Sequence, residues 1–402
     1  PMSKGSAMKI LLVHNRYKLA GGEDVVFNNE LALLQAHNQN VITHTVSNDE
    51  IDDMGKLQAA RNTLWSSDSY RSVAGLIQRE KPEVVHFHNW FMRLSPAVLH
   101  AAHDNGVPIV QTLHNYRLMC PKAVFYRDGH VCEDCLGKLI KYPAIRHGCY
   151  RDSRATSAVV AAMLAFHQLR GTWDKVVDRY IVLTEFARLK FVESGLPADK
   201  LVVKPNYIQV DPGVGQRRGD YAIFIGRMTE EKGVMRLVEA WRELGDLLPL
   251  RVYGEGPLEP EMRAYIEQHG LTNVHLMGQR PRDEVIAALK DAYLLIMPSE
   301  WYEGAPMTLL EAMVCGIPMI AGRLGAAKIA LQDGVNGLHF TPGDSQDLAL
   351  KVRKLVSDPA MAARMAAAAR AEYETHYTAE ANYKLLLEIY QSVARGVSAS
   401  AR

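Results

Sequence analysis

Residues 293–321 read YLLIMPSEWYEGAPMTLLEAMVCGIPMIA, and this stretch decides the fold. Two short apolar runs, residues 293–297 and 317–321, lie on either side of a turn-rich loop and the apolar segment 307–314. Short buried strands that alternate with helical segments are typical of βαβ units, in which a helix joins two parallel strands. The stretch therefore predicts a strand, a helix whose start is marked by Pro306, and a second, parallel strand.

The same alternation continues along the rest of the chain. Strands are predicted in the first half at residues 10–14, 41–45, 84–88, 109–113 and 180–183, and in the second half at 221–225, 250–253, 274–277, 293–297 and 317–321. Helices are predicted between them at 25–35, 69–80, 96–105, 155–172, 185–194, 234–244, 258–269, 283–290, 307–314 and 345–356. Two more helices, 360–373 and 379–394, close the chain.

Two interruptions divide this pattern. Residues 118–154 contain Gly, Pro, charges and four cysteines, and are predicted to be an inserted loop region. Residues 204–220 gather turn formers and charges, which is typical of a linker. We therefore predict an α/β protein with two tandem doubly wound, Rossmann-like domains. Because ligands bind beyond the carboxyl ends of parallel strands, a ligand cleft is expected between the two domains.

Composition restricts the class of protein. A length of 402 residues suits two domains, and the net charge of +1 gives no global attraction to nucleic acid. The longest apolar run, residues 158–166, is too short to span a membrane, and no secretory signal is apparent. A cytoplasmic protein is expected.

The second half carries two glycine turns at predicted strand ends. Gly226 and Arg227 follow one strand, and Lys232 precedes the next helix. A free backbone, a helix N-terminus and two cations suit a diphosphate, although an ordinary turn with solvated charges explains them equally well. Gly254 and Gly256 form a weaker signal, because a plain strand-to-helix turn is the simpler explanation.

The loop after residue 297 carries two glutamates. Glu303 lies just before the predicted helix, where backbone N–H groups near Gly304 and Ala305 are free for a ligand. Glu311 lies within an apolar run, so we expect it to be buried with polar partners such as ribose hydroxyls. Alternatively, Glu303 caps the helix and Glu311 lies in solvent.

In this order, the motifs resemble the family 4 glycosyltransferases. The resemblance rests on the two glycine turns, on the glutamate pair and on the turn Asp333-Gly334-Val335-Asn336-Gly337-Leu338, and it covers nearly all of residues 8–395. It implies the GT-B fold, with an acceptor-side domain at 8–206 that contains the insert 118–154. It also implies a donor-binding domain at 207–378 and a C-terminal helix, 379–395, that crosses back to the first domain.

The resemblance also implies residue roles. Arg227 and Lys232 hold the donor diphosphate, Glu303 binds the sugar hydroxyls, and His114 meets the sugar near its reacting edge. The catalytic set is therefore His114, Arg227, Lys232 and Glu303, and the donor-binding set is Gly21, Gly22, Gly226, Arg227, Lys232, Gly254, Gly256, Arg280, Glu303, Gly304, Ala305, Pro306, Met307 and Glu311. His88 and Asn89, at the end of another strand, are candidates for the acceptor.

The insert leaves two questions open. Cys120, Cys132, Cys135 and Cys149 predict either a structural zinc site or unpaired thiols, because only two of them form a C-x-x-C pair. The insert is also basic, at Lys138, Lys141, Arg146, Arg151 and Arg154, and an apolar helix follows it. This combination predicts either a membrane-facing patch or a buried helix beside a solvated loop.

The expected activity is transfer of a sugar from a UDP- or GDP-sugar to a saccharide or lipid-linked acceptor, in polysaccharide or glycolipid synthesis. The resemblance implies retention at the anomeric carbon. No D-x-D metal motif is apparent, so no cofactor and no catalytic Mg²⁺ are expected. The alternatives are a non-catalytic nucleotide-sugar binding protein and a nucleotide-sugar epimerase of the same architecture.

Overall fold

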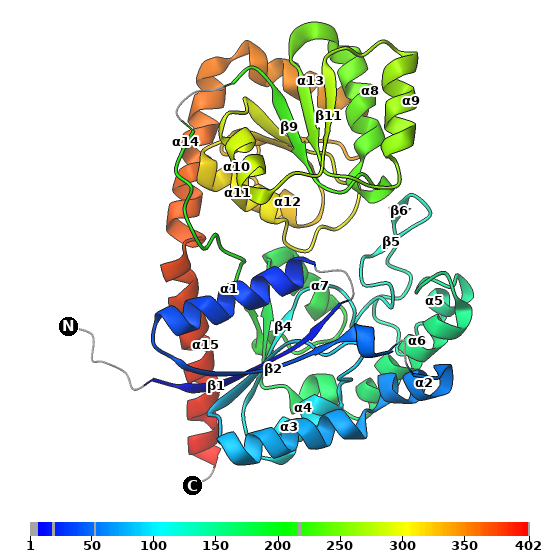
Figure 1. The fold of residues 1–402 in the computed structure, drawn as a ribbon, viewed down its shortest axis with the longest axis vertical. Helices are drawn as coiled ribbons and strands as arrows, with labels where there is room; N and C mark the ends of the chain where they lie inside the picture. Colours follow the sequence, from blue (N-terminus) through cyan, green and yellow to red (C-terminus); the bar gives the residue numbers. More distant parts are fainter. Residues whose placement is uncertain (1–6, 18–20, 52–53, 216–218, 401–402) are drawn as a thin grey trace, which may run out of the picture. The chain divides into compact units, whose positions relative to one another are not determined.

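The computed structural model describes residues 7–17, 21–51, 54–215 and 219–400, so residues 216–218 of the predicted linker lie outside it. The chain separates into two compact units (Figure 1). Unit 1 holds the described residues up to Val124, then Glu133–Asn206 and the segment from Asn382 onward. Unit 2 holds Phe125–Cys132 and Tyr207–Ala381. The predicted insert is therefore divided, since its residues 125–132 belong to unit 2 and not to the first domain.

Unit 1 is built on a six-stranded parallel sheet with the order β2-β1-β3-β4-β7-β8. Its strands are β1 (Lys9–Arg16), β2 (Asn40–Ser47), β3 (Val84–Asn89), β4 (Ile109–Leu113), β7 (Arg179–Val182) and β8 (Leu201–Val203). Its helices are α1 (Gly22–Ala36), α2 (Lys56–Leu64), α3 (Ser67–Glu80), α4 (Ala97–Asp104), α5 (Tyr142–Arg146), α6 (Arg154–Leu169), α7 (Glu185–Glu193) and most of α15 (Ala379–Ser400), with short turns η1 (Asn48–Ile51), η2 (Thr172–Val176) and η3 (Ala198–Lys200).

Unit 2 repeats this plan with the strand order β11-β10-β9-β12-β13-β14, again parallel throughout. Its strands are β9 (Ala222–Ile225), β10 (Leu250–Tyr253), β11 (Val274–Gly278), β12 (Leu294–Met297), β13 (Met319–Gly322) and β14 (Leu338–Phe340), with a small hairpin of β5 (Tyr126–Arg127) and β6 (His130–Val131). Its helices are α8 (Val234–Leu244), α9 (Glu259–Gln268), α10 (Arg282–Lys290), α11 (Met307–Cys315), α12 (Gly325–Ala330), α13 (Ser345–Ser357) and α14 (Pro359–His376), with turns η4 (Glu230–Lys232) and η5 (Gly245–Leu247).

Each face of the unit 2 sheet has its own core. Successive side chains of a strand point to opposite faces. Ala222 and Phe224 accordingly pack with Trp241 in one buried cluster, whereas Ile223 packs with Met313 in another. Strands buried on both faces read as continuous apolar runs, which is why β9 and β12 were predictable.

The last helix completes the core of unit 1. Leu386, Ile389, Tyr390 and Val393 recur at the spacing of one helical face, and all four are buried in a cluster with Ile10 and other strand residues. The face that α15 presents to the sheet is therefore part of the unit 1 core. No helix among the described residues is both long enough and apolar enough to cross a membrane.

Candidate active-site residues in the two units

In unit 2, the two predicted phosphate-binding cations have different surroundings. Arg227 follows β9, and its side chain is 72% exposed, with only a loose contact of 3.7 Å to Glu231. Lys232 ends the short turn η4, and its Nζ lies 2.6 Å from Oε1 of Glu303 and 5.5 Å from the ring centroid of Trp301. Arg227 is thus available to an anion, whereas Lys232 already belongs to an ion pair.

Glu303 is buried and ionised. Its Oε1 accepts hydrogen bonds from Lys232 Nζ and, at 2.7 Å, from Ser299 Oγ. Burial alone raises the pKa of Glu303, but the Lys232 ammonium and the bonds to Lys232 and Ser299 outweigh it and leave the pKa below its ordinary value. A buried carboxylate in this state is an acceptor for hydroxyl groups.

The N-terminus of α11 lies next to this carboxylate in sequence and carries no side-chain cap. Its N-cap residue is Pro306, and the alternative that Glu303 caps the helix is wrong. Among the described residues, nothing accepts a hydrogen bond from the main-chain N–H groups of Gly304, Ala305 and Met307. These donors and the positive end of the helix dipole suit an anionic or oxygen-rich ligand.

A buried polar atom in the loop after β9, Thr229 Oγ1, has no hydrogen-bond partner among the described residues. Trp301, in the loop after β12, instead helps to lower the pKa of Glu303 by a side-chain hydrogen bond. Buried polar atoms are nearly always hydrogen-bonded, so Thr229 Oγ1 is a candidate contact for a ligand.

Glu311 is buried, as predicted, and the solvated alternative is wrong. Its Oε1 lies 2.7 Å from Nη2 of Arg282, a residue that the sequence analysis missed because nothing in the sequence connects α10 to α11. Burial raises the pKa of Glu311, and Arg282 offsets only part of that effect. Arg280, predicted to be part of the donor-binding set, is exposed and donates from Nε to the Met277 carbonyl at 3.0 Å.

The two glycines of the second turn have a structural reason to be glycine. A Cβ atom on Gly254 would overlap the carbonyl oxygen of Gly226, and one on Gly256 would overlap the backbone of Met228. The turns after β9 and β10 therefore pack backbone to backbone. A contact between these glycines and the donor stays a prediction.

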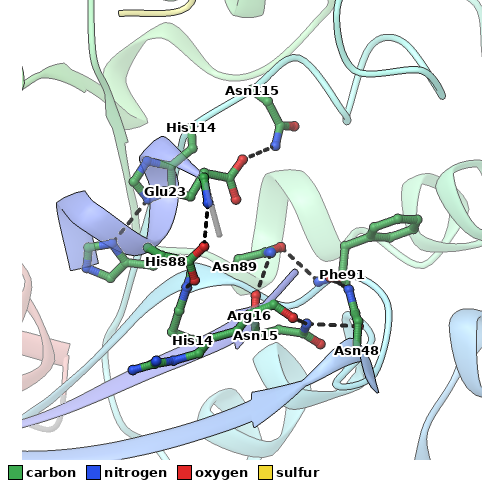
Figure 2. A network of polar contacts seen from close by, with 12 residues as sticks. His14, Asn15, Arg16, Glu23, Asn48, His88, Asn89, Phe91, His114 and Asn115 are labelled. Atoms are coloured by element: carbon green, nitrogen blue, oxygen red, sulfur yellow. Dashed lines mark hydrogen bonds and ion pairs between the residues drawn. The ribbon is translucent and has the colours of Figure 1, made fainter. Parts of the chain in front are cut away.

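In unit 1, three histidines and a carboxylate form a buried chain, of which Figure 2 shows the contact between His88 and His114. His114, which follows β4, places Nε2 3.1 Å from Nδ1 of His88 at the end of β3. His88 Nε2 lies 3.1 Å from Oε1 of Glu30 on α1, and His86 Nδ1 lies 3.0 Å from the same oxygen. Burial lowers the pKa of His88 to about 4 and that of His114 below its ordinary range, so both rings are neutral.

Asn89, predicted to contact the acceptor, holds its own loop together. Its Nδ2 donates to the Asn15 carbonyl at 2.8 Å, and its Oδ1 accepts from the Phe91 N–H at 2.9 Å (Figure 2). Asn15 Nδ2 in turn donates to Asn48 Oδ1 at 2.9 Å. These bonds fix the loop after β3, and the acceptor role of Asn89 and His88 stays a prediction.

Glu23 is a candidate that the sequence analysis did not single out. A cavity of about 30 Å³ is lined by Glu23 together with His88, His114 and Asn115. Glu23 Oε1 accepts from Asn115 Nδ2 at 2.5 Å, while Oε2 is buried and has no hydrogen-bond partner among the described residues. Burial raises the pKa of Glu23 to about 7. The sequence gives no reason to choose Glu23 over its neighbour Asp24 as a site residue. The Asp24 carboxylate instead lies 2.9 Å from His14 Nε2 and accepts a hydrogen bond from the Gly21 N–H.

Gly21 is the N-cap of α1 and Gly22 is its first residue, and a Cβ atom on either would meet no atom of the described residues. Packing within the described part of the chain therefore does not explain why these two residues are glycine. Their predicted role in binding the donor stays a prediction.

The cysteines of the insert are free thiols. Burial raises the pKa of Cys135 to about 11, with smaller contributions from Cys120 and Cys149. Lys141, predicted to be part of a basic surface, is buried instead and donates from Nζ to the Cys135 carbonyl at 3.0 Å. Within the described residues, the three side chains with metal-ligating atoms all inside 4.8 Å are Glu30, His86 and His88. Zinc at the cysteines stays a prediction.

Comparisons with known proteins agree with this architecture. Residues 215–372 match the family model for glycosyl transferases group 1, and residues 55–207 match the glycosyl transferase 4-like domain. The amylovoran biosynthesis glycosyltransferase AmsK of Erwinia amylovora is 28% identical over 219 residues, 51% of this chain and 54% of the relative. The chain thus spans about half of that relative's length. The 2-deoxystreptamine glucosyltransferase of Streptomyces kanamyceticus is 27% identical over 311 residues, 74% of each chain.

Solved structures show the same fold. Anabaena HepE in complex with UDP superimposes with a TM-score of 0.65 at 18% identity, covering 98% of this chain and 100% of HepE. The lipopolysaccharide outer core galactosyltransferase WaaB superimposes with a TM-score of 0.67 at 16% identity, covering 96% and 99%. With two parallel six-stranded sheets and both family domains present, the chain is a member of the family 4-like glycosyltransferases with the two-domain α/β GT-B fold.

Proposed function

We propose that the protein transfers a sugar, with retention, from a UDP- or GDP-sugar to a saccharide or lipid-linked acceptor in polysaccharide or glycolipid synthesis. The observation that carries the proposal is the ion pair between partly buried Lys232 and buried Glu303, which precedes the uncapped N-terminus of α11 in the same unit as exposed Arg227. The name of AmsK supports polysaccharide synthesis, and the UDP complex of HepE supports a uridine diphosphate donor.

The residues of this site suit the charge that develops during the reaction. As the bond to the sugar breaks, the leaving diphosphate gains negative charge, and Arg227, Lys232 and the free N–H groups would stabilise it. The ionised Glu303 would accept hydrogen bonds from the sugar hydroxyls. The leaving phosphate can take the acceptor's proton, so neither a protein base nor Mg²⁺ is part of the proposal.

The acceptor side of the proposal includes contact with the inner face of a membrane by a cytoplasmic enzyme. Apolar side chains are exposed near and on α5, namely Leu139, Ile140 and Tyr142, and at the end of α6, namely Phe166 and Leu169. α5 and α6 pack together, and exposed Lys138, Arg146, Arg151 and Arg154 lie within or next to them in sequence. Exposed apolar and basic side chains on two helices that pack together would suit anionic lipid.

The donor is tested by thermal shifts with UDP-, GDP- and ADP-sugars on the wild type, Lys232→Ala and the control Arg263→Ala, which removes an exposed pair on α9. A ligand that binds only the folded state raises the melting temperature. We expect a shift with one nucleotide class in the wild type and the control, and a smaller one in Lys232→Ala.

Transfer assays complete this test. Lys232→Ala should lower turnover roughly 10²–10³-fold, as for loss of one preorganised donor. Near wild-type turnover in this variant would overturn the assignment of the diphosphate site. Nucleotide-sugar binding without transfer or hydrolysis would favour a binding protein, and interconversion of the donor sugar would favour an epimerase.

A further inference from the structure

We propose that Glu30, held by Lys204, fixes through His88 the tautomer of His114, so that His114 presents an unprotonated Nδ1 as an acceptor for a sugar hydroxyl. The identity of the ligand in this inference rests on the proposed function. The protonation state of the His114 ring does not. Glu30 and His88 act here as positioning residues, because neither is placed against the reacting atoms.

The chain of hydrogen bonds begins at a carboxylate with a fixed charge. Glu30 Oε2 lies 3.0 Å from Lys204 Nζ, which also donates to Asn382 Oδ1 at 3.0 Å. All three side chains are buried. Burial would raise the pKa of Glu30, but Lys204 first, and then His86 and His88, hold it well below its ordinary value. An ionised carboxylate can only accept hydrogen bonds, so it determines the direction of every bond that follows.

The neutral rings of His88 and His114 carry this donor-to-acceptor direction onward from Glu30. A neutral imidazole has one donor and one acceptor nitrogen. His88 faces Glu30 with Nε2, so Nε2 carries the proton and Nδ1 is the acceptor. His114 faces that acceptor with Nε2, so His114 Nε2 must donate and its Nδ1 is unprotonated. Among the described residues, nothing is hydrogen-bonded to His114 Nδ1, and the ring lines the cavity beside Glu23.

The result restricts what His114 can bind. A neutral nitrogen with a lone pair accepts a hydrogen bond from an O–H group, whereas a protonated ring would pair with a phosphate. The arrangement therefore assigns His114 to a neutral hydroxyl of the sugar and not to a phosphate.

A metal ion is the competing explanation for this cluster, since ligand atoms of Glu30, His86 and His88 lie within 4.8 Å of one another. Two observations favour the hydrogen-bonded chain. The ammonium of Lys204 already neutralises Glu30, and both ring nitrogens of His86 have hydroxyl partners, Tyr390 at 2.7 Å and Thr112 at 2.8 Å.

The direct test is nitrogen NMR of the full chain labelled at histidine, at pH 7, with the His114 signals assigned by their loss in His114→Gln. We expect neutral rings protonated at Nε2 for both His88 and His114. An Nδ1–H tautomer or an imidazolium at His114 would overturn the proposal. So would one equivalent of a metal that is retained after dialysis and lost, in elemental analysis, from Glu30→Gln. This readout needs no activity, so it stands or falls independently of the proposed function.

Two substitutions at one position test the consequence for catalysis. His88→Gln can donate to Glu30 through its amide N–H and accept from His114 through its oxygen, whereas His88→Phe can do neither. We expect His88→Phe to lower kcat about 10–100-fold, as for loss of an outer-shell orienting group, and His88→Gln to recover most of it. The control His167→Gln removes another buried histidine of unit 1, bonded to Thr172 and Leu64, and should change stability without changing kcat.

Equal losses of kcat in both His88 variants, with an unchanged His114 tautomer, would reduce His88 to a packing role and refute the proposal. Binding of the free nucleoside diphosphate, measured by thermal shift, should be the same in the wild type and in both His88 variants, because the cations that would hold it lie in unit 2. Absence of transfer in the wild type with every donor would instead count against the proposed function.

Discussion

At the scale of single residues, the fold raises the pKa of the Glu23 carboxyl group to near neutral pH. Its pKa of about 7, raised by burial, lies above the ordinary value of 4.5. Between these two values the folded chain keeps a proton that the unfolded chain has lost. The free energy of unfolding therefore falls as pH rises from about 4.5 to 7 and is level above that range.

Replacing Glu23 with Gln should remove this loss of stability at higher pH. Since one pKa unit corresponds to about 1.4 kcal/mol, Glu23→Gln is expected to be more stable than the wild type by on the order of 2 kcal/mol at pH 8, with little difference at pH 4.5. Denaturant titrations at the two pH values measure this, with Glu388→Gln on the exposed side of α15 as control. A stability difference that did not depend on pH would contradict the prediction.

Single residues also show where sequence reasoning stops. The burial of Glu311 was predictable from its apolar neighbours, but its partner Arg282 was not, because the pair forms only when α10 meets α11. Glu30 lies within the predicted helix 25–35 and was not singled out, and its buried partner Lys204 lies in the segment predicted to be a linker. Charge pairs between distant segments leave no local pattern.

At the scale of elements, α5 and α6 carry the surface that we propose for lipid. Vesicles with anionic lipid should bind the wild type, and neutral vesicles should bind it more weakly, because about 1 kcal/mol per basic residue comes from the negative surface. Leu139→Asp with Ile140→Asp should reduce binding at least tenfold in a sedimentation assay. Leu350→Asp, an equally exposed leucine on α13, is the matched control. Equal binding by both variants would show that another surface meets the membrane.

Elements differed in how well the sequence predicted them. Strands β4 and β10 and helix α8 have the predicted bounds, because buried runs and amphipathic periods are local signals. Strands β8 and β14, of three residues each, were missed because such runs are too short to stand out. The insert was predicted to be loop, yet it contains α5, which packs against α6, and the hairpin of β5 and β6.

At the scale of the molecule, unit 1 depends on a segment from the far end of the chain. Each of Leu386, Ile389, Tyr390 and Val393 is buried, and loss of one such side chain typically costs 2–5 kcal/mol. Losing all four by deletion of residues 382–402 should therefore cost about as much as the whole stability of a typical domain, about 5–15 kcal/mol, and unfold unit 1. Limited proteolysis with mass spectrometry should then find cuts within residues 8–206 and protection within 219–378.

A shorter deletion, residues 395–402, is the control, because it keeps the four buried side chains. If the longer deletion left residues 8–206 as resistant to protease as the wild type, the packing of α15 would not be needed for the stability of unit 1.

The discontinuity of unit 1 also has a consequence for biogenesis. Translation delivers all six strands of that sheet before residue 207, but the ribosome supplies the helix that packs on them only after unit 2. Unit 2, apart from its small hairpin, is continuous from Tyr207 to Ala381 and is complete before that helix emerges. Although domains usually fold in the order of synthesis, here synthesis of unit 1 begins before that of unit 2 and is completed after it. A nascent unit 1 therefore waits with an uncovered apolar sheet face, on which chaperones can act until α15 arrives.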